Sequence, residues 1–200
     1  MLTVEQNLKL NHIIADRLLE RLEFIPFQPD NILEFGFIDA YLIDKLAIYY
    51  PTAELYSLCG NNIDQINCSN KHNIFASHFQ ELPLENNSLD LIVSNLSIDC
   101  LHPDLDKYFK ELHRIIRPDG LLLFTILNVD QINHNQLLKV GDLLLANKFC
   151  DPVIDQELIN INYRSEDLED PDCEKMIAVE IFYGHALGSN LIKTPINIYS

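Results

Sequence analysis

Three side chains with reactive groups lie close together in the sequence, at Asp99, Cys100 and His102. A carboxylate, a thiol and an imidazole can bind a metal ion, or can supply a nucleophile and its base. Their spacing matches no strong metal-binding motif, and the five cysteines include no C-x-x-C pair. We therefore interpret the segment as a polar loop, and predict neither a metal site nor a catalytic residue.

An acid and a glycine follow the first strand-like apolar run, in Ile32-Leu33-Glu34-Phe35-Gly36. Open α/β sheets bind ligands beyond the carboxyl ends of their central strands, where a glycine lets the backbone approach the ligand. Glu34 is a candidate for such contact, although an acid at this place can also cap the next helix or face water. Gly36 is expected in a tight turn from strand to helix, with or without a ligand.

Strands and helices alternate along the chain and must position these residues. Apolar residues at helical spacing predict a first helix from Thr3 to Phe24, ended by Pro26 and Pro29. Short buried runs predict strands at Ile32–Phe35, Glu54–Cys59, Asn73–Ala76, Leu89–Leu96 and Leu121–Leu127, with a turn at Pro118–Gly120. Further helices are predicted at 43–50, Asn62–Ser69, Asp104–Arg117 and His134–Lys148.

Two last strands, Val153–Tyr163 and Met176–Tyr183, are expected to pair as an antiparallel edge. The alternation predicts a parallel α/β sheet. We expect a single domain over residues 1–200, on which an N-terminal helix within residues 1–27 packs.

The composition excludes several kinds of partner. Hydrophobic residues make up 48% of the chain, and 30 acidic against 14 basic residues give a net charge of -16, with no basic block. A globular domain is expected, with neither nucleic acid nor an anionic membrane as its partner. The odd, scattered cysteines fit reduced thiols, and no apolar stretch is long enough to span a membrane, so a cytoplasmic location is expected.

The segments 87–96 and 112–124 look like the region from strand four to strand five of class I S-adenosylmethionine-dependent methyltransferases. Three further segments, 14–22, 140–144 and 182–186, resemble the malonyl acyl-carrier-protein O-methyltransferases of biotin synthesis, the BioC family. The resemblance implies a Rossmann-like fold. Its doubly wound, mostly parallel sheet would have seven strands, with helices on both faces and an antiparallel last strand.

The cofactor positions that the resemblance implies are altered. The family's E/D-x-G-x-G-x-G loop is matched here by residues 34–40, in which Glu34 and Gly36 remain but Ile38 and Ala40 replace glycines, and Asp39 adds a negative charge. The remaining implied cofactor positions are Cys59 in place of the ribose-binding acid, His78 in place of the adenine-binding Asp, and Asn95 near the end of the fourth strand. Loss of the ribose and adenine contacts would cost about 4–6 kcal/mol, which takes a micromolar site to the millimolar range.

We therefore expect a BioC-like pseudo-methyltransferase that acts as a binding or regulatory module, with S-adenosylmethionine binding lost or very weak. One alternative is an active S-adenosylmethionine-dependent O-methyltransferase acting on a carboxylate or a carrier-bound acyl group, and another is a cleft that takes a different ligand. The expected partner is a paralogous methyltransferase or a second copy of the chain. Arg17, Arg21 and Lys45 form the candidate basic patch for an acidic carrier protein. The tyrosines can stack on an adenine, line a partner surface or pack in the core; they are Tyr41, Tyr49 and Tyr50.

Overall fold

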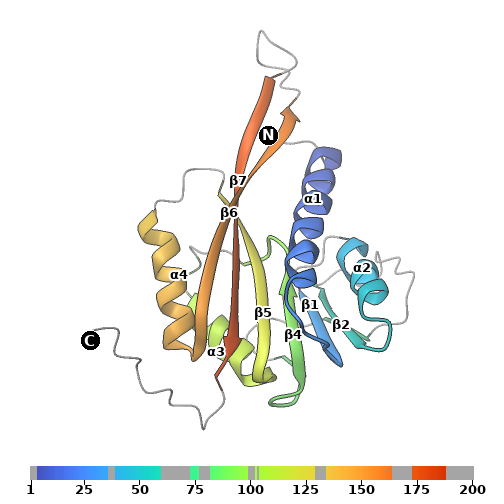
Figure 1. The fold of residues 1–200 in the computed structure, drawn as a ribbon, viewed down its shortest axis with the longest axis vertical. Helices are drawn as coiled ribbons and strands as arrows, with labels where there is room; N and C mark the ends of the chain where they lie inside the picture. Colours follow the sequence, from blue (N-terminus) through green and yellow to red (C-terminus); the bar gives the residue numbers. More distant parts are fainter. Residues whose placement is uncertain are drawn as a thin grey trace.

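The computed structural model describes residues 4–35, 39–59, 73–76, 82–98, 102, 104–128, 134–163 and 173–187. These residues form one seven-stranded sheet in the order β3-β2-β1-β4-β5-β7-β6, together with four helices (Figure 1). The helices are α1 (Val4–Glu23), α2 (Tyr41–Tyr49), α3 (Leu105–Ile115) and α4 (His134–Ala146). The strands are β1 (Asn31–Phe35), β2 (Glu54–Cys59), β3 (Asn73–Ala76), β4 (Leu89–Ser94), β5 (Ile116–Asn128), β6 (Phe149–Tyr163) and β7 (Cys173–Ala186).

The sheet is parallel from β3 through β5, whereas β7 runs antiparallel to both β5 and β6. These pairings confirm the predicted Rossmann-like α/β architecture and the antiparallel edge. Strand order reverses between β1 and β4, because β1 is flanked by β2 on one side and by β4 on the other. Such a reversal opens a crevice at the carboxyl ends of the two strands, which is the usual ligand site of this architecture.

Two apolar cores cover the two faces of the sheet. Helices α1 and α2 pack on the face that carries Ile32, Leu91 and Leu123. Helices α3 and α4 pack on the opposite face, which carries Leu33, Ile92 and Phe124. Consecutive residues of a strand point to opposite faces, so central strands buried on both sides are apolar throughout.

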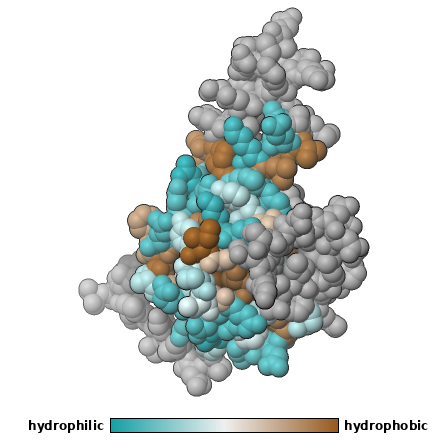
Figure 2. All heavy atoms as spheres, turned by 90° about the vertical axis from the view of Figure 1, so that its right-hand side faces the viewer, coloured by the Kyte–Doolittle hydropathy of each residue, from teal (hydrophilic) through white to brown (hydrophobic). Residues whose placement is uncertain are grey.

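Strands β6 and β7 extend past the other strands. Their pairing continues beyond the level at which Asn128 pairs with Ala178, up to the pair Tyr163 and Cys173. Figure 1 shows this hairpin projecting at the end of the molecule where α1 begins. In Figure 2 a band of hydrophobic surface crosses the molecule below the projecting end. None of the described helices is both long and apolar enough to cross a membrane.

The start of β5 differs from the sequence prediction, which placed a turn at Pro118–Gly120. Ile116 already pairs with Leu89, and the register then shifts before Leu121 pairs with Leu91. The extra residues form a bulge in which Asp119 has a φ of 64°. Gly120 is required there, because a Cβ atom would lie 2.9 Å from the main-chain oxygens of both Arg117 and Asp90.

Candidate functional site

The predicted site residues fall at the carboxyl edge of the sheet, as far as the structure describes them. Glu34 is the penultimate residue of β1, Cys59 ends β2, and Asn95 directly follows β4. Gly36, Ile38 and His78 lie outside the described residues. The structure thus brings parts of three strands to the predicted crevice between β1 and β4.

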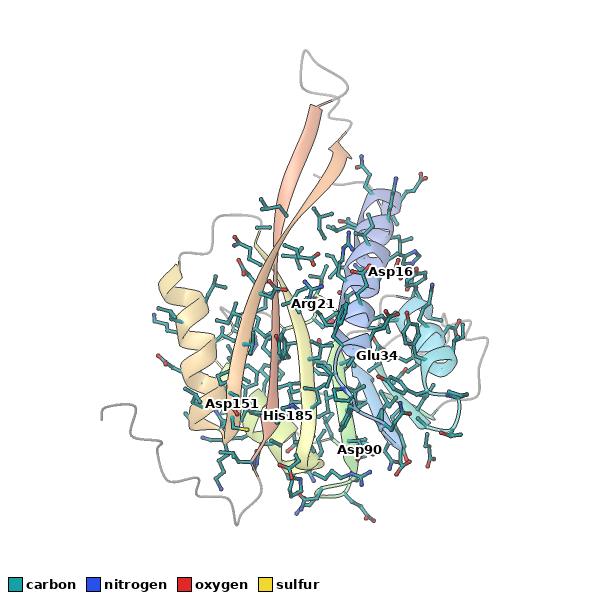
Figure 3. All side chains as sticks on the ribbon, viewed as in Figure 1. Asp16, Arg21, Glu34, Asp90, Asp151 and His185 are labelled. Atoms are coloured by element: carbon teal, nitrogen blue, oxygen red, sulfur yellow. The ribbon has the colours of Figure 1, made fainter. Side chains whose placement is uncertain are left out.

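Glu34 is buried on the face that α1 and α2 cover, and its side chain is seen in the interior in Figure 3. Only 3% of the residue is exposed, and its Oε2 atom has no hydrogen-bond partner among the described residues. Ser57 lies opposite Glu34 in the β1–β2 register, and within the described part of the chain its Oγ is also without a hydrogen-bond partner. Burial, reinforced by the charge of Asp39, raises the pKa of Glu34 to about 8, while the Ser57 hydroxyl acts in the opposite direction. At neutral pH this carboxyl group is therefore mainly protonated.

Asn95 is held by helix α1. Its Nδ2 donates to the main-chain oxygen and to the Oδ1 of Asn11, each at 2.9 Å, and its Oδ1 accepts a hydrogen bond from Thr125 Oγ1 at 3.1 Å. The next residue, Leu96, has a φ of 56°, and its N–H donates to the same Thr125 Oγ1 at 2.9 Å. Both amide protons of Asn95 are thereby used inside the protein.

Asp39 is also tied to helix α1. Its Oδ2 lies 2.6 Å from His12 Nε2, and its Oδ1 accepts the N–H of Tyr41 at 3.1 Å. The His12 ring stacks on the Tyr41 ring with 3.9 Å between centroids. Tyr41 itself donates its hydroxyl to Asp16, so it joins α1 to α2 rather than standing free for an adenine ring.

The candidate basic patch is not a patch of free positive charge. Arg17 pairs with Glu20 and Glu157, and Arg21 with Asp155 and Glu157. Lys45 lies 4.0 Å from Asp16 and 5.3 Å from the Tyr41 ring centroid. The two arginines instead form ion pairs that join α1 to β6. Their surroundings therefore do not support the expectation that these residues attract an acidic carrier protein.

His102, in the predicted polar loop, makes its contacts with residues at the start of α3. His102 Nδ1 accepts a hydrogen bond from the Asp104 N–H at 3.1 Å, directly before α3, and its ring packs edge-on against Tyr108. Asp99 and Cys100 lie outside the described residues. Among the residues that are described, no three His, Cys, Asp or Glu side chains are grouped so that they could hold a metal ion.

Sequence reasoning missed the partners of the site, namely Asn11, His12, Ser57 and Thr125. Asn11 follows Leu10 and lies within the apolar stripe of α1, where it is 9% exposed. A polar residue on that stripe is the one signal that the sequence offered. Ser57 and Thr125 sit within strands and carry no motif, so only the sheet register reveals them.

A doubly wound sheet with an acid near the end of β1 and a reversal of strand order between β1 and β4 is typical of Rossmann-like proteins, the methyltransferases among them. Residues 8–165 match the family described as "Methyltransferase domain", and the chain belongs to this family. Phosphoethanolamine N-methyltransferase 2 of Haemonchus contortus, solved with S-adenosyl-L-methionine, shares the fold. Its TM-score is 0.60 at 13% identity, over 86% of this chain and 53% of that one.

Within this class the chain is similar to the malonyl-[acyl-carrier protein] O-methyltransferases. It is 27% identical over 184 residues to the Legionella pneumophila protein, covering 80% of this chain and 64% of the relative. Identity to malonyl-[acyl-carrier protein] O-methyltransferase 1 of Coxiella burnetii is 32% over 167 residues, or 76% of this chain and 58% of the relative. The chain thus spans less than two thirds of the length of these relatives.

Proposed function

We propose that this protein is a BioC-like pseudo-methyltransferase, in which S-adenosylmethionine binding and methyl transfer are lost or very weak and the fold acts as a binding or regulatory module. The observation that carries the proposal is the engagement of helix α1 with the crevice. Asn11 takes both amide protons of Asn95, and His12 pairs with Asp39. A ligand that needed either group would first have to displace an internal partner.

The described residues fit S-adenosylmethionine poorly. The methionine part of this cofactor carries an ammonium and a carboxylate group, so its binding needs an ionised acid on one side and hydrogen-bond donors on the other. The pKa of Glu34, raised to about 8 by burial, leaves that acid mainly neutral at pH 7. Asp39 adds a negative charge that would repel the ligand's carboxylate. Asn95 keeps no amide proton for the ligand.

The substitutions at Ile38, Cys59 and His78 support the same proposal from the sequence. A branched side chain replaces a glycine, and a thiol, which is a weak acceptor, replaces a carboxylate. Contacts at separate places in a ligand add approximately, so the combined loss amounts to about three powers of ten in affinity.

The proposal is tested by restoring the family's residues in the double variant Ile38→Gly/Cys59→Asp. We expect millimolar S-adenosylhomocysteine to raise the Tm of this variant and to leave that of the native chain unchanged. The conservative double variant Ile38→Val/Cys59→Ser serves as the matched control and should behave as the native chain does. Equal Tm shifts for the native chain and the restored variant would contradict the proposal.

The second candidate is an active O-methyltransferase acting on a carboxylate or carrier-bound acyl group. It is favoured by the identity to relatives named malonyl-[acyl-carrier protein] O-methyltransferase and by the retained acid, Glu34. Transfer of labelled methyl from S-adenosylmethionine to malonyl-[acyl-carrier protein] distinguishes the two. We expect no transfer above the background without protein, and turnover by the native chain would establish the second candidate.

A further inference from the structure

A cavity of about 470 Å³ lies between the end of α1 and the end of α2. The residues that line it include the aromatic residues Phe27, Tyr49 and Tyr50. These residues precede the first residues of β1 and β2, so the cavity lies at the amino edge of the sheet. The crevice with Glu34 and Asn95 is at the opposite, carboxyl edge, and the cavity is therefore a separate site.

Glu23 supplies the cavity with a carboxylate. Its Oε1 accepts a hydrogen bond from the Tyr49 hydroxyl at 2.7 Å, and no cation of the described residues is paired with it. This hydrogen bond, followed by burial and by the charges of Glu23, Asp16 and Glu20, raises the pKa of Tyr49. The charged groups that act on the Tyr49 hydroxyl are thus acidic. Arg17, in the same helix, is bound to Glu20 and Glu157 rather than to Glu23.

A carboxylate beside aromatic faces is suited to a cationic group, above all to the planar guanidinium of arginine. Such a group gains a charge-assisted hydrogen bond from the acid and an attraction to the ring faces. Phe24 and Ile48, which directly adjoin lining residues in the chain, are 83% and 72% exposed. An apolar polypeptide segment that carries the cation would bury such side chains, whereas a small cation would not.

Charge complementarity indicates which kind of polypeptide the cavity would bind. The chain carries a net charge of -16, so a second copy would be repelled while a basic partner would be attracted. We propose that this cavity binds an arginine side chain from a basic, apolar segment of a partner protein. The proposal names a partner chemistry for a binding module, but it rests on the cavity alone and holds whether or not the crevice binds a cofactor.

The test uses the fluorescein-labelled peptide Leu-Arg-Leu-Arg-Leu and measures its binding to the full chain by fluorescence anisotropy. The control peptide carries citrulline, a neutral isostere, in place of each arginine. We expect the arginine peptide to bind at least about tenfold more tightly than the citrulline peptide, the effect of one charge-assisted hydrogen bond. No difference between the peptides, or no binding of either, would overturn the proposal.

Variants distinguish binding of the peptide in the cavity from attraction by the net negative charge of the chain. Glu23→Gln should weaken binding of the arginine peptide about tenfold, and Tyr49→Ala should weaken it as well. Glu85→Gln removes the same charge from an exposed position outside the cavity, and should change the affinity less than about twofold. Equal losses for Glu23→Gln and Glu85→Gln would show attraction by net charge only and would overturn the proposal. The titrations contain no cofactor, so their outcome is independent of the proposed loss of S-adenosylmethionine binding.

Discussion

Asn11 in helix α1 and Asn95 after β4 are joined by two hydrogen bonds, both donated by Asn95 Nδ2 at 2.9 Å. The pair is buried, with 9% of Asn11 and 5% of Asn95 exposed. It places a helix from the start of the chain against the strand end where this architecture binds its ligand. A ligand at this strand end would therefore compete with a contact inside the protein.

Removal of the Asn11 side chain should destabilise the fold. In Asn11→Ala the Asn95 amide loses one acceptor in a buried place, which costs about 1–3 kcal/mol of the free energy of unfolding. Urea denaturation measures the change. Asn7→Ala, at an exposed position of the same helix, should stay within about 0.5 kcal/mol of the native value. Equal effects of the two substitutions would contradict the structural role given to Asn11.

Glu34 should make stability depend on pH. Its pKa is raised from 4.5 to about 8 in the folded protein, mainly by burial. The folded state therefore holds this proton more tightly than the unfolded state does. The stabilisation is fully present below the unfolded pKa of 4.5, and is lost as pH rises towards the folded pKa of about 8.

The neutral variant Glu34→Gln removes this dependence. Between about pH 5.5 and about pH 7.5, its free energy of unfolding should rise relative to that of the native chain by roughly 2 kcal/mol. Urea denaturation at the two pH values gives the difference. A pH-independent difference would mean that Glu34 is ionised in the folded protein.

Substitution by alanine should lower the stability of the fold at Gly120 and raise it at Gly141. In Gly120→Ala the new Cβ would meet Ile116 Cγ1 at 2.6 Å and two main-chain oxygens at 2.9 Å, so a loss of about 2 kcal/mol or more is expected. Gly141 lies inside α4 with nothing within 4 Å of an added Cβ. Gly141→Ala should therefore gain about 0.5–1 kcal/mol from helix propensity. Thermal unfolding of both variants checks the pair, and a tolerated Gly120→Ala would contradict the bulge geometry.

The ion pairs that join Arg21 of α1 to β6 should contribute less to the stability of the fold. Arg21 is bound by Asp155 and Glu157, and 22% of its side chain is exposed. Arg21→Met keeps the apolar stem and should cost about 1 kcal/mol at low salt, and less at high salt because ions screen the pairs. Lys110→Met, which removes an exposed pair within α3, is the matched control and should cost less. A loss of stability in Arg21→Met that does not depend on salt would contradict an electrostatic contribution from these ion pairs.

Local sequence patterns predicted the central strands well because burial on both faces makes them continuous apolar runs. Strands β2 and β3 have the predicted bounds, Glu54–Cys59 and Asn73–Ala76. The start of β5 at Ile116 was missed, because it depends on pairing with Leu89 across a bulge rather than on the local Pro118–Gly120 turn signal. Strand β6 begins at Phe149 instead of Val153, because Phe149 and Cys150 pair with β7 ahead of a register shift that precedes Val153.

The site was predictable only in part. Glu34 lies near the end of one buried strand and Asn95 directly follows another, and their place at the carboxyl edge follows from the architecture. The contacts of α1 with Asn95 and Asp39 depend on how the helix lies across the strand ends, which apolar periodicity does not specify. The raised pKa of Glu34 likewise requires knowledge of its burial and of the nearby Asp39 charge.

The most direct test of the central claim is calorimetric titration of the native chain with S-adenosylmethionine and S-adenosylhomocysteine up to millimolar concentration. The altered cofactor positions and the occupied groups of Asp39 and Asn95 predict no saturable heat. Saturable binding with a micromolar Kd for either ligand would contradict the claim and would establish a working cofactor site.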